Sequence, residues 1–266
     1  MKRILLVFLM ILLTATGYCE NETFVIEEIN LEMVNCPAGK FMMGSPEEEQ
    51  GRFGNENQHL VTITKPFYIG KYEVTQSQYE HLMERNPSEF KGANKPVDSV
   101  SYNDAKAFCD KLNQKYLSLL PKGYRFDLPT EAQWEYACRA GTKTALNNGN
   151  NLTSTNGDYS NIDEVAWYAN ILDSGSHLVG QKKPNAWGIY DMHGNVSEWC
   201  RDWYGEYPNE EAIDPMGDNN TSARRVYRGG SYGSSPTFCR SAIRIGANPD
   251  IPPLILGFRA ALVCIE

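Results

Sequence analysis

"NAWGIYDMHGNVSEWCRDWY", residues 185 to 204, is the stretch from which the fold can be argued. It holds Asp191 and Glu198 seven residues apart, with Gly194 between them. Carboxylate oxygens are the hard ligands that Ca²⁺ prefers, and glycine permits a tight backbone turn that aims carbonyl oxygens inward. The stretch therefore indicates a calcium-binding turn, and the alternative is a plain acidic turn that binds nothing.

Capping boxes predict three short helices upstream of this stretch. In each of them a Ser or Thr is followed three residues later by Gln or Asp, a pair that satisfies the first backbone N–H groups of a helix. The helices are expected over residues 75–83, 101–116 and 130–141, beginning at Thr75, Ser101 and Thr130.

Short strands and long irregular segments make up the rest of the expected structure. Strands are predicted within residues 30–45 and 61–74, and the polar, Gly-rich residues 46–58 between them are predicted to be a surface loop. From residue 141 onward, Gly, Asn, Ser, Asp and aromatic residues follow one another with little periodicity. An irregular segment of that length needs specific interactions to hold it in one conformation. Disulfides, bound calcium and buried tryptophans are the candidates.

The N-terminus predicts export. Lys2 and Arg3 precede the apolar run Ile4–Leu13, and small residues follow, which is typical of a signal peptide over residues 1–19. The run has about half the length that crosses a bilayer, so no membrane-spanning segment should remain after cleavage. We expect a secreted, periplasmic or cell-surface protein, with a lipid anchor at Cys19 as an alternative to simple cleavage.

Composition limits the partners and the chemistry. The net charge of −8 disfavours nucleic acid and anionic lipid as partners. After removal of the predicted signal peptide, the chain is long enough for one large domain, which we expect over residues 27–264. No CxxC pair occurs and the four histidines are scattered singly, so neither a structural zinc site nor a histidine-based catalytic triad is predicted.

Several spaced motifs resemble the formylglycine-generating enzyme family, also called sulfatase-modifying factor domains. They are "FMMGS", "YIGKYEVTQSQY", "KPVDSVSYNDAKAFC", "RFDLPTEAQWEYACRAG", the opening stretch, and "YRGGSYGSSPTFCRSAIRIGANPDIPPLILGFRAAL" at 227–262. The resemblance covers nearly the whole mature chain. It implies a C-type-lectin-like α+β fold with small antiparallel sheets, few short helices and much irregular structure.

The resemblance also implies metal ligands. One calcium ion would be held by the side chains of Asp191 and Glu198 and the carbonyls of Gly194 and Val196. A second calcium site would begin at Asn170 and Ile171, although the loop that supplies its other ligands is shortened here.

Copper is the point at which this sequence departs from the family. The generating enzymes oxidise a sulfatase cysteine with oxygen and with copper held by two cysteines shortly after "RGGS". Here Ser234 stands at the first cysteine position and Cys239 at the second. Cu(I) prefers a pair of soft thiolates, so one sulfur among hydroxyls is a poor copper site. The resemblance surrounds this site with Ser231, Ser235 and Phe238 and, on the stretch quoted first, with Ser197 and Trp199 as the lining of a substrate groove.

The state of Cys239 is left open by the sequence. Counting backward from "GFR" places it at a disulfide position, where the resemblance pairs it with Cys138. The alternative is a reactive thiol, whose thiolate needs a nearby cation; Arg240 and Arg244 are candidates, but both equally suit pairing with core carboxylates. For the other cysteines we expect Cys36 to approach Cys264, with Cys109 as a competitor for Cys264.

The first of two competing functions is an exported, calcium-stabilised binding module. It lacks one copper cysteine and would hold a peptide, glycan or protein partner on a concave surface around Ser197, Trp199, Ser231 and Ser234. The loops 205–222 and 246–256 would vary with the ligand. A lectin that grips sugar through the metal is a weaker form of this hypothesis.

The second function is an oxygen-dependent oxidoreductase of the formylglycine-generating type, acting on a sulfatase cysteine. Cys239 would then form a transient mixed disulfide with the substrate peptide. Copper would be a cofactor only under this hypothesis.

Overall fold

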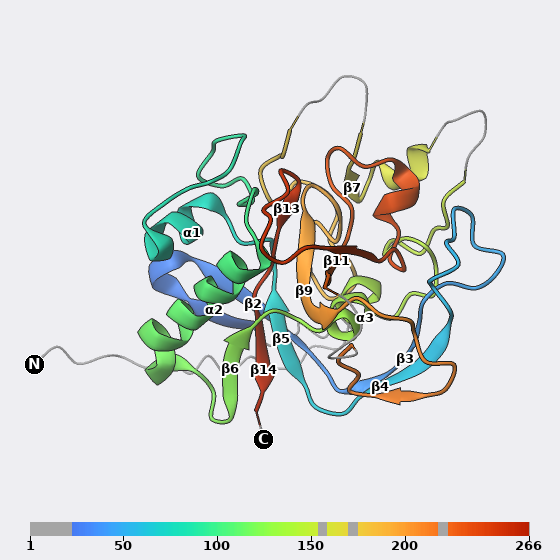
Figure 1. The fold of residues 1–266 in the computed structure, drawn as a ribbon, viewed down its shortest axis with the longest axis horizontal. Coiled ribbons are helices and arrows are strands. Elements are labelled where there is room, and N and C mark those ends of the chain that lie inside the picture. The colour runs from blue at the N-terminus through green and yellow to red at the C-terminus, as the bar shows by residue number, and fades with distance from the viewer. Residues whose placement is uncertain (1–22, 154–158, 170–174, 218–222, 266) are drawn as a thin grey trace, which may run out of the picture.

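The computed structural model describes residues 23–153, 159–169, 175–217 and 223–265 (Figure 1). The predicted signal peptide, Cys19 and the residues Asn170 and Ile171 lie outside these ranges. Within them, no helix has both the length and the apolar character needed to cross a membrane.

All three predicted helices form, and each begins where its capping box places it. The side chains of Thr75, Ser101 and Thr130 each accept a hydrogen bond from the backbone N–H three residues on, and the reciprocal bond is also present. The helices are α1 (Gln76–Met83), α2 (Tyr102–Tyr116) and α3 (Glu131–Arg139). Short 3₁₀ turns occur at η1 (Glu27–Ile29), η2 (Leu117–Leu119), η3 (Ser160–Ile162) and η4 (Pro236–Cys239).

The largest sheet has five strands, all antiparallel to their neighbours. In spatial order they are β1 (Thr23–Ile26), β2 (Leu31–Cys36), β5 (Phe67–Gly70), β14 (Ala261–Cys264) and β6 (Tyr124–Asp127). Helices α1 and α2 lie to one side of it (Figure 1). A core that includes Tyr79, Phe108, Phe126 and Leu262 fills the space between.

Three smaller sheets complete the fold. One has β10 (Ala212–Ile213) parallel to β4 (His59–Ile63), which is antiparallel to β3 (Gly39–Met43). Another has the order β12 (Ile245–Ala247), β11 (Arg225–Arg228), β9 (Ser197–Trp203) and β13 (Leu256–Gly257), with only the last pair parallel. The third is the parallel pair β7 (Ala166–Trp167) and β8 (His193–Gly194).

The predicted strands therefore exist, but they do not form hairpins. Residues 30–45 supply β2 and β3, which belong to different sheets, and residues 61–74 supply β4 and β5, which also belong to different sheets. The chain thus passes from the five-stranded sheet to the three-stranded sheet and back, and α3 packs against the latter near β3. The architecture is the predicted one, α+β with small sheets and few short helices.

Disulfides do not organise the irregular half of the chain. None of the six described cysteines forms a disulfide. The expected approach of Cys36 to Cys264 is wrong because β5 lies between β2 and β14. Strands two apart in a sheet are about 10 Å from each other, whereas disulfide Cα atoms lie within about 7 Å.

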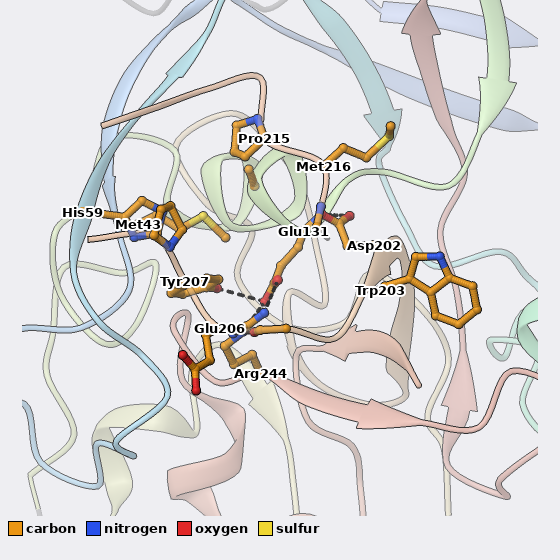
Figure 2. A pocket seen from close by; sticks show the side chains of 14 residues that line it. Met43, His59, Glu131, Asp202, Trp203, Glu206, Tyr207, Pro215, Met216 and Arg244 are labelled. Atoms are coloured by element: carbon orange, nitrogen blue, oxygen red, sulfur yellow. Dashed lines mark hydrogen bonds and ion pairs between the residues drawn. The ribbon is translucent and has the colours of Figure 1, made fainter. Parts of the chain in front are cut away.

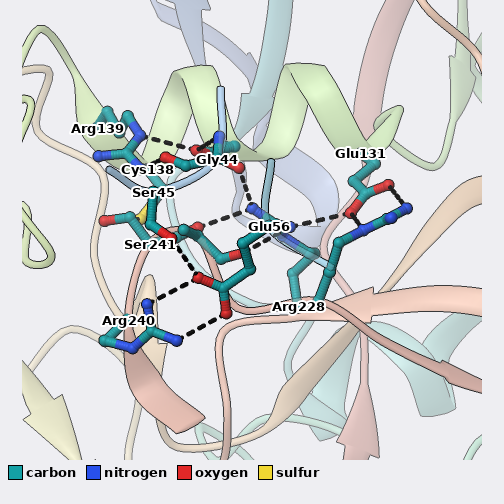
Figure 3. Close-up of polar contacts among 12 residues, drawn as sticks. Gly44, Ser45, Glu56, Glu131, Cys138, Arg139, Arg228, Arg240 and Ser241 are labelled. Atoms are coloured by element: carbon teal, nitrogen blue, oxygen red, sulfur yellow. Dashed lines mark hydrogen bonds and ion pairs between the residues drawn. The ribbon is translucent and has the colours of Figure 1, made fainter. Parts of the chain in front are cut away.

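Buried arginines take the organising role instead. Arg228, Arg240, Arg244 and Arg259 are each 4% exposed or less, and each binds at least one buried carboxylate. Arg228 binds two carboxylates on one helix, since it reaches Glu131 at 2.9 Å and also Glu135, both on α3 (Figure 3). It further donates to the carbonyl of Ser241 at 2.7 Å. One side chain thereby ties α3 to the chain segment after β11.

We predict that Arg228→Met lowers the free energy of unfolding by about 3–5 kcal/mol. The substitution removes one of the two cations from each of two buried carboxylates, because Glu131 keeps only Arg244 and Glu135 keeps only Arg139. Urea unfolding followed by circular dichroism measures the loss. Lys40→Met is the matched control, since Lys40 and Glu211 form a pair that is 58% and 44% exposed, and exposed pairs contribute at most about 1 kcal/mol. Equal losses for the two variants would contradict the role given to Arg228.

Candidate functional site

Cys239 lies in a dry, apolar environment at the end of η4. Its side chain is fully buried in a cluster with Leu146, Leu152, Ile162, Val165 and Ala166. Burial raises the pKa of its thiol to about 12, although a backbone hydrogen bond from Ser231 acts in the opposite direction. The sulfur is therefore a protonated thiol at neutral pH and a weak nucleophile.

The two arginines proposed as thiolate partners are engaged elsewhere. Arg240 binds Glu56 at 2.7 Å and Glu49 at 2.6 Å, and Arg244 binds Glu131 at 2.7 Å. Arg240 and Arg244 therefore pair with buried carboxylates and do not stabilise a thiolate at Cys239. Residues 46–58 consequently do more than cover the surface, since Arg240 fixes this loop to the segment that carries Cys239 (Figure 3).

The hydroxyls near Cys239 bind one another. Ser231 Oγ lies 3.0 Å from Ser234 Oγ, which also accepts the Ser231 backbone N–H at 3.0 Å. Within the described ranges no group of three His, Cys, Asp or Glu side chains is arranged to hold a metal. A single protonated thiol beside paired hydroxyls does not fit Cu(I), which requires soft thiolate ligands.

The structure also differs from the predicted Cys138–Cys239 disulfide. The His193 ring contacts both residues: its Nε2 is 3.8 Å from Cys138 Sγ, and its Nδ1 donates to the Cys239 carbonyl at 2.6 Å. Cys138 Sγ lies 3.5 Å from Ser241 Oγ instead of bonding to sulfur. Burial lowers the pKa of His193 to about 4, so this imidazole is neutral at pH 7. Nothing in the sequence pattern indicated that His193 would lie between these two cysteines.

The predicted substrate groove is not assembled as expected. Ser197 and Trp199 are buried, and the Trp199 indole donates to the carbonyl of Val100 at 3.0 Å. Ser235 is exposed, whereas Phe238 is half-buried with its ring 5.3 Å from that of Phe53. Ser197 and Trp199 lie on the same face of β9. The residues between and after them are buried as well, so neither face of this part of the strand is open to a ligand.

The predicted calcium ligands are close together, but Glu198 is already neutralised. Arg259 donates to both of its carboxylate oxygens at 2.6 Å, and the Trp134 indole donates to one of them at 2.6 Å. Gly194 has the predicted left-handed conformation, with φ of 79°. A side chain there is impossible, since a Cβ atom would lie 1.9 Å from the carbonyl oxygen of Trp167.

The other acidic groups offer little more to a cation. One oxygen of Asp191 accepts the Gly180 backbone N–H at 2.7 Å, and its second oxygen is buried without a hydrogen-bond partner. Glu73 accepts the backbone N–H of Val196 at 2.9 Å. Burial raises the pKa of Asp191 to about 6 and that of Glu73 well above its ordinary value. Ca²⁺ takes six to eight oxygens. The predicted side-chain ligands supply one unpaired carboxylate oxygen, and even with the two predicted backbone carbonyls this set is too small to fit the ion.

We therefore predict that EDTA leaves the Tm of the protein unchanged within about 1 °C, because Arg259 already balances Glu198. Differential scanning calorimetry with EDTA and then with excess Ca²⁺ tests this. A fall in Tm with EDTA that Ca²⁺ restores would show that the protein binds stabilising Ca²⁺, as the sequence-based expectation requires.

A separate pocket of about 340 Å³ lies beside the first turn of α3 (Figure 2). Its floor is polar but internally paired: Glu131 accepts from the Tyr207 hydroxyl at 2.9 Å and from Arg244 Nε at 2.8 Å. Burial acts to raise the pKa of Glu131, but Arg244 and Arg228 hold it below its ordinary value. Asp202 accepts the backbone N–H of Glu131 at 2.7 Å. The Glu131 charge in the floor is therefore paired with arginine, and both Glu131 and Asp202 already accept hydrogen bonds from the protein.

The walls of this pocket are mainly sulfur-containing, aromatic and proline side chains. They include Met43, His59, Trp203, Tyr207, Pro208, Pro215 and Met216. The His59 and Tyr207 rings pack 4.8 Å apart, and Glu206 stands exposed at the rim. Most of the wall comes from residues 205–217, within the loop 205–222 that was expected to vary with the ligand. The sequence signalled this loop, but not the pairing of Glu131 with Arg244 beneath it.

Comparison with known proteins supports the motif-based resemblance. A family described as "Sulfatase-modifying factor enzyme 1-like domain" matches residues 25–263. The formylglycine-generating enzyme of Mus musculus is 30% identical over 292 residues, covering 86% of this chain and 74% of that protein. A protein named "Chaperone protein LppX" from Paenibacillus barcinonensis is 35% identical over 223 residues, covering 66% of this chain and 72% of that protein.

Solved structures agree with the same fold. PvdO from Pseudomonas aeruginosa superimposes with a TM-score of 0.79 at 30% identity, covering 92% of this chain and 99% of PvdO. Treponema denticola variable protein 1 gives a TM-score of 0.78 at 28% identity, with coverage of 92% and 99%. The expected C-type-lectin-like fold is confirmed.

Proposed function

Because the chain belongs to the family of sulfatase-modifying factor enzyme 1-like domains, we propose that it is an exported binding domain of this family and not a copper-dependent oxidase. The observation that carries the proposal is the environment of Cys239. Its thiol is buried among apolar side chains, its pKa is raised to about 12, and the neighbouring hydroxyls of Ser231 and Ser234 are bonded to each other.

Catalysis of the family's type requires a sulfur that both binds metal and meets a substrate cysteine. A thiolate and solvent access are needed for that exchange. Cys239 has neither in this structure, and the nearest cations are committed to carboxylates. The oxidoreductase hypothesis therefore depends on one thiol that is buried among apolar side chains and protonated at neutral pH.

We predict that the purified protein binds Cu(I) no more tightly than its Cys239→Ser variant, and that it leaves a sulfatase-derived cysteine peptide unoxidised in air. A Cu(I) competition titration with a chromogenic chelator and mass spectrometry of the peptide measure the two properties. Stoichiometric Cu(I) binding that the variant loses, together with an aldehyde product, would establish the enzyme instead.

We propose that the pocket beside α3 is the ligand-binding site. Its size and apolar walls suit a large apolar side chain of a partner protein, because the carboxylates of its floor are already hydrogen-bonded within the protein. The name of one relative, a chaperone protein, is consistent with a protein as the partner. Of the partner classes expected from the sequence, a peptide or protein is therefore preferred to a glycan.

We predict that Met216→Glu weakens binding of the neutral dye Nile red about fivefold or more, since a carboxylate on the wall must be desolvated or displaced. Fluorescence titration of the dye measures the affinity. Leu119→Glu is the matched control, because Met216 is 45% exposed and Leu119, on η2 outside the pocket, is 55% exposed. A similar loss in both variants would contradict the assignment of the pocket.

A further inference from the structure

A compact group of cations surrounds Asp127 at the end of β6. Lys106 on α2 binds one carboxylate oxygen of Asp127. Arg125 on β6 and Arg201 on β9 lie 3.3 Å and 3.5 Å from the other oxygen. Three cations from three different elements therefore converge on one carboxylate that is itself buried.

A fourth cation, Arg225 on β11, adjoins this group. Its guanidinium lies 3.5 Å from the centre of the Trp203 ring and 4.5 Å from that of Tyr102. It donates to the carbonyl of Arg201 at 2.8 Å, which places it next to the other three. The two aromatic rings hold this guanidinium in a fixed orientation.

The acidic groups nearby are too few to neutralise these four cations. Asp127 and Asp202 are the carboxylates that act on Arg225 and Tyr102. Four positive charges against two negative charges leave a local charge of +2, in a chain whose net charge is −8. Such a surplus on an acidic protein attracts anions to this place.

The cations also retain donors that face outward. The side chains of Lys106, Arg125 and Arg201 are 28%, 48% and 27% exposed. Arg125 uses only Nη2 toward Asp127, and Arg201 approaches it only through Nε. In the described part of the chain the terminal nitrogens of Arg201 make no hydrogen bond with protein, so they are available to a ligand.

We propose that Lys106, Arg125, Arg201 and Arg225 form a binding site for a divalent oxyanion, a phosphate or sulfate group. The charge of such a group matches the local surplus of +2, and guanidinium groups bind its oxygens through paired N–H donors. Because three of the cations share one carboxylate, they are too close together to follow an extended acidic chain. The proposal does not rest on the pocket ligand proposed above or on the chemistry of Cys239, although Asp202 and Trp203 adjoin both the pocket and this site.

Isothermal titration calorimetry on the full folded domain tests the site, with ionic strength held constant by NaCl. Inorganic sulfate and inorganic phosphate should bind saturably at one site, whereas acetate should not. O-phosphoserine separates two sources of the same chemistry: tighter binding than inorganic phosphate indicates an ester carried by a larger molecule, and weaker binding indicates the free ion. Heats that do not differ from those of chloride overturn the proposal, and so does tighter binding of triglutamate than of sulfate, which would indicate an acidic peptide.

Two variants and one control locate the binding. Arg201→Gln and Arg125→Gln should each weaken sulfate binding about tenfold, as expected for loss of one charge-assisted donor group. Arg125 is the more exposed of the two, so its variant remains informative if Arg201→Gln unfolds. Lys183→Gln removes the same charge from an exposed pair with Glu164 and should leave the affinity unchanged. Equal affinities for all three variants would overturn the assignment to this cluster.

Discussion

The pairing of buried guanidinium groups with buried carboxylates is the interaction on which the irregular half of this protein depends. After residue 141 the described chain forms no α-helix and only short strands, so regular secondary structure does little to hold its backbone in one conformation. Each buried arginine supplies several directed N–H groups and satisfies backbone carbonyls as well as carboxylates, as Arg259 does with Glu198 and with the carbonyl of Gly70. Removing either partner leaves a charge in a dry interior, and this makes the arrangement cooperative.

The same interaction separates the fold of the family from its chemistry. Arg240 and Arg244 lie in the segment where a copper site would be needed, yet their charges are taken up by Glu49, Glu56 and Glu131. No charge is left to stabilise a thiolate at Cys239, and apolar residues enclose its sulfur. Under the proposed function, the scaffold persists without the catalytic chemistry, and a surface pocket lined by an expected variable loop carries the binding.

Local signals in the sequence were sufficient for the helices and for the class of fold. A capping box is decided within four residues, which is why Thr75, Ser101 and Thr130 could be identified as helix starts without any tertiary information. The assignment of β2 and β3 to different sheets, and the place of β5 between β2 and β14, depend on pairings across the whole chain. For the same reason the partners of Cys36, Cys138 and Cys239 could not be derived from spacing.

The pocket shows a similar division. Its loop was expected to be variable under the binding-module hypothesis, but the floor joins Glu131 of α3 to Arg244, which is 113 residues away in the chain. The expected groove does not form, because Trp199 points inward and donates to the carbonyl of Val100. A strand buried on both faces shows no alternation of apolar and polar residues, so the sequence could not reveal this orientation.

The segment between Arg228 and Arg240 is anchored at both ends by these ion pairs, while Gly233 and Ser235 in its middle are exposed. Its conformation is consequently set by its two ends and by the buried or bonded side chains of Ser231, Ser234 and Cys239, and not by its exposed residues. Substitutions of the exposed residues should therefore be tolerated during evolution. A lineage can exchange these residues and acquire new binding specificities while the fold stays the same.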